Sequence, residues 1–362
     1  MKGQLTLPRP TPALGQTYYE KNLSMRLNHS LEASKNYAIY LNSNRRQKLL
    51  QYRPIKIDIE PISRCNFRCT MCVVSSWDKG KRAQDLTLES FEQILESEPQ
   101  IVEIKLQGLG EPLMLGDSLF EMIRLARRQH IWVRTTTNAS LLHLNENYTK
   151  LIDSGICEIQ VSIDGATDAT FESIRKGGKA KRVFSNCQIL NSYAERVNWQ
   201  CAKMWTVVQT SNLNELEDLV HVASDLGFKS QCFAIDLHGW GVEEWNTINS
   251  GVEVSSESLN NNRFLELIEI GKRLDVKVEF WQNATKYSIS QPESLCPWPF
   301  ERTMITSDLR VTPCCMISNP ETYEIGSKYE ISSWESSDYQ NFRNLHLSGQ
   351  IPNVCKSCYS DQ

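Results

Sequence analysis

The 362-residue sequence lacks the features that mark several common classes of protein. It contains no run of about 18 apolar residues, which excludes a transmembrane helix. The first 16 residues are polar and rich in proline, without the apolar stretch of a signal peptide. The net charge is only −4, which disfavours a protein that wraps duplex nucleic acid. We therefore expect a cytoplasmic location and neither membrane nor nucleic-acid partners.

Charge is unevenly distributed along the chain. The first 50 residues contain eight Lys or Arg and two Asp or Glu, so they carry +6 and leave −10 for the rest. Apolar residues recur at helical intervals over residues 18–50, and Pro54 ends the pattern. We interpret residues 1–54 as an N-terminal helical extension. Its basic residues belong to a solvated face, with contact to an anionic partner as the alternative.

Strands and helices alternate from residue 55 onward. The spacing of apolar residues predicts six strands, separated by helices, in the range 55–240. The predicted strands cover residues 55–62, 101–106, 131–137, 158–164, 203–209 and 231–237, and the helices cover residues 88–96, 119–128, 148–154, 183–197 and 212–226. Repeated units of this kind form a parallel sheet, either open or closed into a barrel.

The alternation ends near residue 240. We interpret residues 241–291 as a bridging region, with a helix at 264–274 and a short strand at 276–280. Residues 292–362 are interrupted repeatedly by cysteine and proline, and their apolar runs are short. So small a core does not fold without a covalent or metal staple. We therefore predict a small separate domain over residues 292–362.

Cysteine is abundant, with twelve residues. In a reducing compartment, cysteines more often bind metal or take part in chemistry than form disulfides. Cys65, Cys69 and Cys72 follow the first predicted strand in the spacing Cys-x3-Cys-x2-Cys. Three thiolates in one loop can bind three irons of a [4Fe-4S] cluster and leave the fourth iron open. A structural zinc ion would need a fourth ligand nearby, and the neighbouring sequence supplies neither Cys nor His.

This motif, placed after the first strand of a βα-repeat chain, resembles the radical S-adenosylmethionine (SAM) superfamily. The chain departs from the usual pattern at Met71, where the family commonly has an aromatic residue. The resemblance implies an α/β fold with a partial (β/α)6 TIM-like barrel over residues 55–240. It also implies that SAM binds the open iron and is cleaved reductively to a 5′-deoxyadenosyl radical, which abstracts a hydrogen atom from a C–H bond. The electron would come from a donor such as flavodoxin or ferredoxin.

The same resemblance implies a set of SAM-binding residues at the ends of successive strands. The segment Gly108-Leu109-Gly110-Glu111-Pro112 is similar to the family's GGE motif, and Ser162-Ile163-Asp164-Gly165 is similar to its SIDG segment. An arginine that pairs with the SAM carboxylate matches Arg175, since a guanidinium binds a carboxylate through two parallel hydrogen bonds. The expected SAM-binding residues are Gly108, Gly110, Glu111, Asn138, Ser162, Asp164 and Arg175.

A second group of cysteines lies in the C-terminal region. Its spacing resembles the SPASM/Twitch extension of radical SAM enzymes, which carries auxiliary [4Fe-4S] clusters. Five cysteines are too few for two clusters, so the one-cluster form fits better. The expected ligands are Cys296, Cys314, Cys355 and Cys358. Cys315 could replace Cys314, and a zinc ribbon remains an alternative because paired cysteines also suit zinc.

Three further residues are candidates for catalysis. Cys232 lies in the sixth predicted strand, on the same face as Asp236, and His238 follows. If that face points into the barrel, Cys232 could return a hydrogen atom to a substrate radical, and packing in the core is the alternative. Asp236 and His238 could bind a polar group or act as a base, or belong to a capping loop.

We therefore predict epimerisation of a small polar substrate, such as a sugar or aminocyclitol. The alternatives are dehydrogenation with the auxiliary cluster as electron acceptor, modification of a short peptide, and a non-catalytic zinc or iron–sulfur binding protein.

Overall fold

The computed structural model describes residues 6–78, 82, 84–237, 247, 250–254, 258–282, 285–326 and 329–361. Its centre is a nine-stranded sheet in the order β11-β10-β1-β3-β4-β5-β7-β8-β9. The strands are β1 (Lys56–Ile59), β3 (Glu103–Leu106), β4 (Trp132–Thr137), β5 (Glu158–Ser162), β7 (Ala202–Val207), β8 (Ser230–Ile235), β9 (Lys277–Gln282), β10 (Arg302–Ile305) and β11 (Val311–Thr312). A separate two-stranded sheet pairs β2 (Arg68–Cys69) with β6 (Arg175–Lys176).

The large sheet is a partial barrel. All of its neighbouring strands pair in parallel except β10 and β11, which are antiparallel. The edge strands β9 and β11 do not pair with each other in the described part of the chain, so the barrel is open. The six strands predicted between residues 55 and 240 are β1, β3, β4, β5, β7 and β8. The predicted α/β fold is thereby confirmed, and β9 and β10 extend it at either edge.

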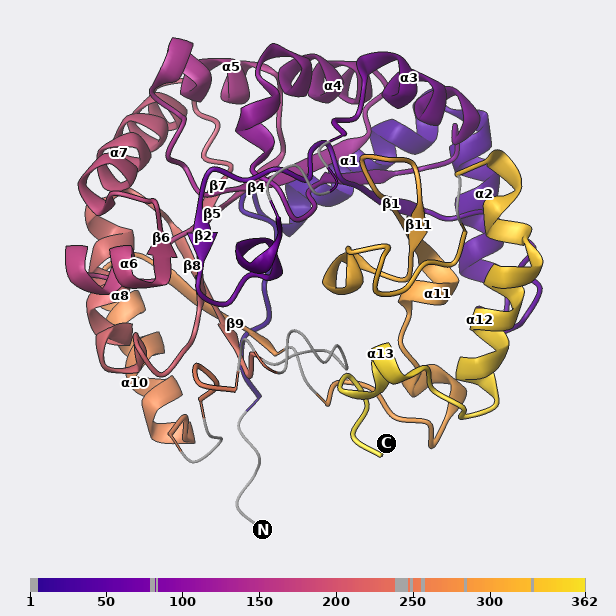
Figure 1. Cartoon of the computed structure of the whole chain (residues 1–362). Coiled ribbons are helices and arrows are strands. Elements are labelled where there is room, and N and C mark those ends of the chain that lie inside the picture. Colours follow the sequence, from indigo (N-terminus) through magenta and orange to yellow (C-terminus); the bar gives the residue numbers. More distant parts are fainter. Residues whose placement is uncertain are drawn as a thin grey trace.

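Helices surround the strands on the outside (Figure 1). They are α3 (Leu88–Ser97), α4 (Asp117–Arg128), α5 (Asn147–Asp153), α6 (Asp168–Ile174), α7 (Ala180–Arg196), α8 (Leu216–Asp225) and α10 (Asn261–Arg273). Side chains alternate along each strand, so Ile57 and Ile59 of β1 join the hydrophobic core beneath the helices. The intervening residues Lys56 and Asp58 therefore face the barrel interior.

The predicted helix over residues 18–50 is wrong in its extent. It consists of two helices, α1 (Gln16–His29) and α2 (Leu31–Asn42), that meet at Ser30. Ser30 has an extended backbone, and its side chain accepts a hydrogen bond from the Ala33 N–H at 3.1 Å. Serine is a strong N-cap residue, so it begins a new helix where the apolar spacing alone indicates none.

The N-terminal segment closes the barrel at the end where its strands begin. The buried guanidinium of Arg26 donates to the carbonyl oxygens of Ile101 at 2.8 Å and Gln129 at 3.0 Å. The Thr11 N–H donates to the Glu279 carboxylate of β9 at 2.9 Å. These contacts hold the N-terminal extension against the end of the barrel where the strands begin, which we call the barrel floor. The extension therefore packs as part of the barrel.

A belt of ion pairs fills the interior just above this floor. Glu103 pairs with Lys56 at 2.8 Å and with Arg134 at 2.9 Å. On the opposite side, Lys203 pairs with Glu279 at 3.2 Å and with Glu158 at 3.8 Å. Charged groups so deeply buried need partners of opposite charge, and the belt supplies them across six strands.

The C-terminal region shares the barrel sheet. Its strand β10 pairs in parallel with β1, Ile305 lying opposite Ile59. Its helices are α11 (Trp298–Glu301), α12 (Ser337–Leu347) and α13 (Asn353–Lys356), and α12 lies at the side of the molecule (Figure 1). We predicted a small separate domain over residues 292–362. The region instead shares the barrel sheet through β10, a long-range pairing of which the local sequence pattern gives no sign.

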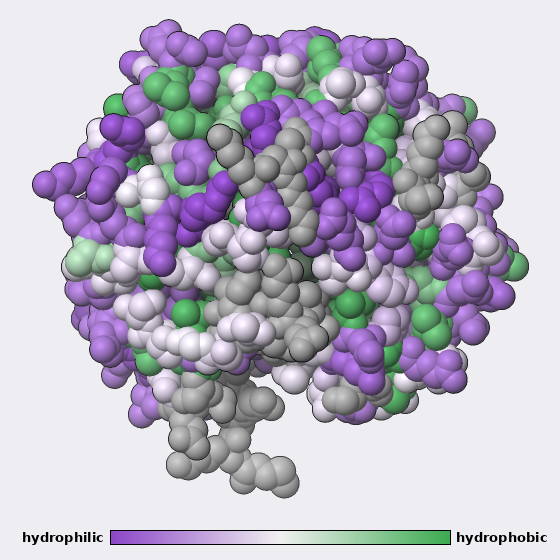
Figure 2. Space-filling model, viewed as in Figure 1, coloured by the Kyte–Doolittle hydropathy of each residue, from purple (hydrophilic) through white to green (hydrophobic). Residues whose placement is uncertain are grey.

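The face shown in Figure 2 is mostly hydrophilic, with its hydrophobic residues in small separate groups. None of the helices in the described ranges combines the length and hydrophobicity that crossing a membrane requires.

Candidate functional site

The first cysteine loop is held by the small two-stranded sheet. Strand β2 places Cys69 directly opposite Arg175 of β6. The Arg175 Nη1 atom lies 3.9 Å from Cys69 Sγ. The Cys72 N–H donates to the Cys69 carbonyl oxygen at 3.1 Å. The thiols of Cys65, Cys69 and Cys72 are near enough that each charge would raise the pKa of its neighbours. The structure thus gathers these three thiols in one place.

Burial sets the protonation of these thiols. It raises the pKa of Cys65 to about 12 and that of Cys72 to about 11. Both are neutral at physiological pH unless iron binds, and iron binding must release their protons. No three His, Cys, Asp or Glu side chains in the described ranges converge as ligands of a single metal ion. A four-iron cluster does not require that convergence, since each of its thiolates binds a different iron.

The turn that follows β3 lies on the side chain of Glu60. A Cβ on Gly108 would come within 2.2 Å of Glu60 Cγ, so only glycine fits there. The Glu60 carboxylate accepts a hydrogen bond from the Leu109 N–H at 3.0 Å. The predicted SAM-binding turn is therefore supported from beneath by Glu60, which has no exposed surface.

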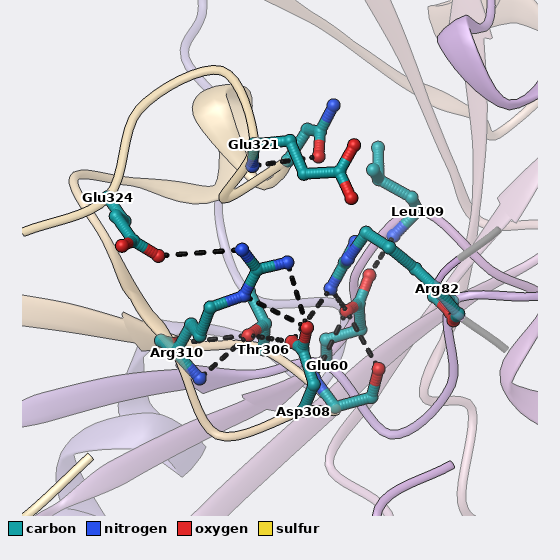
Figure 3. Close-up of polar contacts among 11 residues, drawn as sticks. Glu60, Arg82, Leu109, Thr306, Asp308, Arg310, Glu321 and Glu324 are labelled. Atoms are coloured by element: carbon teal, nitrogen blue, oxygen red, sulfur yellow. Dashed lines mark hydrogen bonds and ion pairs between the residues drawn. The ribbon is translucent and has the colours of Figure 1, made fainter. Parts of the chain in front are cut away.

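Glu60 also joins the turn to the C-terminal region (Figure 3). Its second carboxylate oxygen accepts bonds from the N–H and the hydroxyl of Ser307, both at 3.1 Å. Arg82 donates to the same oxygen at 2.6 Å and reaches Asp308 at 3.3 Å. Arg310 in turn pairs with Asp308 at 2.9 Å. One buried carboxylate thus connects the barrel, the SAM-binding turn and the C-terminal region.

Glycine is required again at Gly110. A Cβ there would lie 2.3 Å from the Ile62 carbonyl oxygen, and the next N–H, of Glu111, donates to the Arg64 carbonyl oxygen at 2.9 Å. The buried Glu111 carboxylate accepts bonds from the Thr137 hydroxyl at 2.6 Å and the Asn138 N–H at 2.8 Å. The predicted residues of the second and third strand ends are therefore in direct contact.

Asn138 reaches the cysteine loop through its side chain. Its amide nitrogen donates to the Asn66 side-chain oxygen at 3.0 Å, and its own oxygen accepts from the Ser140 hydroxyl at 2.6 Å. Asn66 lies between Cys65 and Phe67. Asn138 consequently positions the loop as well as being a candidate SAM contact.

Arg175 is paired with Asp164. Its Nη2 atom lies 2.6 Å from an Asp164 oxygen, and the other Asp164 oxygen accepts from the Val207 N–H at 2.7 Å. The Arg175 Nε atom is buried and has no partner among the described residues. This leaves one guanidinium donor for a ligand beside Cys69. Ser162 ends β5, two residues before Asp164. The predicted SAM contacts of these residues stay predictions.

The second cysteine set is gathered from distant parts of the chain. Charge on Cys296, Cys355 or Cys358 would raise the pKa of Cys314, which burial already raises. The main charged neighbours of Cys315 are instead Asp58 and Lys105 in the barrel interior. The expected ligand set with Cys314 is therefore a spatial cluster, while Cys315 faces the barrel.

The three catalytic candidates differ in where the structure places them. Cys232 faces the interior as expected, since it is in register with Glu279 of β9, but it has no exposed surface and lies at the level of the ion-pair belt. Asp236 follows β8 with a left-handed backbone (φ 55°), and burial raises the pKa of Cys358, to which the charge of Asp236 adds. His238 lies outside the described residues. Catalytic roles for these residues stay predictions.

Two protein-family profiles match this chain. The profile of the "Radical SAM superfamily" matches residues 59–223, and that of the SPASM "Iron-sulfur cluster-binding domain" matches residues 296–359. The chain therefore contains a radical SAM domain, followed by an iron–sulfur cluster-binding domain of the SPASM kind. The two matched ranges contain the two cysteine sets, so the predicted order of a radical SAM domain followed by an auxiliary-cluster domain is confirmed.

Relatives of this radical SAM protein include two curated enzymes. The "PqqA peptide cyclase" of Bradyrhizobium diazoefficiens is 23% identical over 84% of this chain and 78% of its own length. The "Mycofactocin maturase MftC" of Mycolicibacterium smegmatis is 25% identical over 55% of this chain, which is 49% of that protein. Streptococcus suis SuiB, solved with its precursor peptide SuiA, covers 91% of this chain and 76% of its own, at 14% identity and a TM-score of 0.65. The similarity to SuiB shows that the two chains share a fold.

The residues present fit the cofactors that the superfamily implies. These are a [4Fe-4S] cluster, SAM and an auxiliary cluster. Three thiols on one loop, one of a buried residue and two of half-buried residues, suit the first cluster. The unpartnered Arg175 Nε atom beside them suits the SAM carboxylate. Four thiols gathered from the C-terminal region suit the auxiliary cluster.

Sequence reasoning missed Glu60, although a signal was present. Glu60 and Asp58 are acidic residues that alternate with isoleucines in an otherwise apolar strand. Acidic residues at inward positions of a strand indicate a polar barrel interior. The partner residues Arg82 and Ser307 could not be identified in this way, because they lie far from Glu60 in the sequence.

Proposed function

We propose that this radical SAM enzyme modifies a peptide. The observation that carries the proposal is the similarity to the PqqA peptide cyclase, which extends over 84% of this chain and 78% of that enzyme. The similarity to MftC and the shared fold with SuiB, which was solved with a precursor peptide, support the same substrate class. This reading replaces our first expectation of epimerisation on a small sugar-like substrate.

The position of Cys232 is a second argument against that first expectation. A hydrogen donor must reach the substrate carbon, but Cys232 has no exposed surface and its charged neighbours are Lys203, Glu279 and Glu158 of the ion-pair belt. Burial also raises the pKa of its thiol well above the ordinary value. These features are those of a buried packing residue.

The chain's own residues would bind and orient the reactants. The [4Fe-4S] cluster and SAM supply the radical chemistry, and the protein positions them and excludes water. Cys65, Cys69 and Cys72 would hold the cluster, and Arg175 would bind the SAM carboxylate through its free Nε–H group. Glu60 and Glu111 fix the turn and the strand end on which SAM would lie.

Deuterium transfer tests the proposal. Reconstituted enzyme is incubated under anaerobic conditions with SAM and a reductant, together with either a perdeuterated peptide digest or a mixture of perdeuterated sugars and aminocyclitols. Abstraction of a substrate hydrogen places deuterium in 5′-deoxyadenosine, which mass spectrometry detects. We expect deuterium from the peptides. Transfer from the sugar mixture alone would contradict the proposal.

A further inference from the structure

Two charged residues in the barrel interior remain outside the ion-pair belt. Asp58 of β1 and Lys105 of β3 are directly opposite each other in neighbouring strands, one inward position beyond Lys56 and Glu103. Among the described residues, neither side chain makes a hydrogen bond, and no ion pair within 4.0 Å joins the two. The neighbouring positions Lys56, Glu103 and Arg134 are all paired, so the exception is local.

The Asp58 carboxylate is the more unusual of the two. Only 2% of the residue is exposed, and its Oδ2 atom is buried without a partner. Buried polar atoms in folded proteins nearly always have partners, because an unpaired one loses its hydrogen bonds to water without replacement. Burial raises the pKa of Asp58 and lowers that of Lys105, so both groups are under-solvated. A ligand that offers a hydrogen-bond donor to Asp58 and an acceptor to Lys105 would give both side chains a partner.

The pair lies between the two cysteine sets. Strand β1 leads from Asp58 through Glu60 to the loop that begins at Cys65. On the other side of β1, strand β10 of the C-terminal region pairs with it, and Met304 lies opposite Asp58. The chain continues from β10 to the expected ligand Cys314. A substrate held at this pair would therefore lie between the SAM site and the auxiliary cluster.

We propose that Asp58 and Lys105 bind the backbone of the peptide substrate, Asp58 accepting an N–H group and Lys105 donating to a C=O group. In an extended peptide, the N–H and C=O of one residue point to the same side, as they do in an antiparallel ladder. Opposite residues on neighbouring strands are only about 4.8 Å apart, so two side chains there can reach groups of the same peptide residue. Binding through backbone groups does not depend on which side chains the peptide carries. The inference rests on the proposed function.

Binding of a small probe tests this site without turnover. The probe is N-acetyl-trialanine amide, which carries backbone N–H and C=O groups and no charge. Its Kd for the reconstituted, SAM-loaded protein is measured by calorimetry. We expect Lys105→Met to raise the Kd about tenfold, since a charge-assisted hydrogen bond is lost, and Asp58→Asn to raise it severalfold. Should Asp58→Asn fail to fold, Lys105→Met decides alone.

Matched controls separate the pair from general effects of charge. Lys229 and Asp275 form an exposed ion pair at 2.8 Å on the outside of the barrel. Lys229→Met and Asp275→Asn should leave the Kd unchanged. A fully N-methylated probe lacks the N–H groups that Asp58 would accept, so Asp58→Asn should no longer affect its binding. Iron content should be the same in all variants, and Lys229→Met and Asp275→Asn should cleave SAM at the rate of the parent.

Two outcomes would overturn the inference. One is a parent protein that does not bind the probe, and the other is equal binding by the parent, Asp58→Asn and Lys105→Met. Deuterium transfer from peptides in the parent shows separately whether the proposed function holds. Transfer from peptides with unchanged probe binding in the variants would retain peptide modification and place the peptide elsewhere in the barrel.

Discussion

The two cysteine sets of this protein differ in how the chain assembles them. Cys65, Cys69 and Cys72 lie in a single loop, held by the pairing of β2 with β6. The C-terminal set extends from Cys296 to Cys358 and comes together only in the fold, where Cys355 of α13 lies near Cys314. A local motif can be interpreted from its spacing, whereas a dispersed set requires the fold. The following predictions test that difference.

The largest expected effect follows from removing the local set. Replacing Cys65, Cys69 and Cys72 with alanine should abolish SAM cleavage and leave about half of the iron, since two four-iron clusters are expected. Iron analysis and 5′-deoxyadenosine formation measure the two effects. Full iron content in the triple variant would show that the loop does not hold a cluster.

The dispersed set can be dissected with two adjacent cysteines. Cys314→Ala should remove the auxiliary cluster, because Cys314 lies with Cys296, Cys355 and Cys358, while Cys315→Ala should keep the iron, because Cys315 faces Asp58. Metal binding contributes to the folding of so small a core, so Cys314→Ala should also expose the C-terminal region to protease. The reverse pattern of iron loss would assign Cys315 as the ligand.

A third prediction concerns the link between the two regions. Glu60→Gln breaks a buried ion pair with Arg82 and weakens the support of the Leu109 N–H, so the free energy of unfolding should fall by about 3–5 kcal/mol. SAM affinity should fall as well. Ser307→Ala removes only a hydroxyl donor and should cost about 1 kcal/mol. Chemical denaturation and SAM titration measure both, and equal effects from the two variants would contradict a central role for Glu60.

The smallest expected effect is a pH dependence of stability in the C-terminal region. Burial lowers the pKa of His346 in α12 to about 4, below its ordinary value near 6.5. The unfolded chain therefore binds a proton more readily, so this stability is complete above pH 6.5 and is lost as the pH falls toward 4. The loss at pH 5 is about 2 kcal/mol.

Protease sensitivity of the C-terminal region at pH 5 and pH 7 measures this effect. The parent should become more sensitive at pH 5, whereas His346→Gln, which does not titrate, should show the same sensitivity at both values. Replacement of the exposed surface residue His221 serves as the control, and it should behave like the parent. If His346→Gln also became more sensitive at pH 5, the acid effect would come from another group.

The elements that could be predicted are those with local signals. The six strands of residues 55–240 follow from apolar alternation, and the first cysteine loop follows from its spacing. The break at Ser30 was missed because capping by a single hydroxyl changes the helix without changing the apolar pattern. The pairing of Arg175 with Asp164 was also missed, since their contact depends on how β6 returns to the barrel.

The sequence by itself determined the alternation of strands and helices, the two cysteine groups and the superfamily. These depend on periodicity and on spacing within a few residues. The tertiary structure decided that β10 pairs with β1, that Glu60 binds Ser307, and that Cys314 and Cys315 face different sites. Each of these depends on residues far apart in the chain. Their pairing is set by the packing and hydrogen bonding of the complete fold, to which the local pattern contributes only one side.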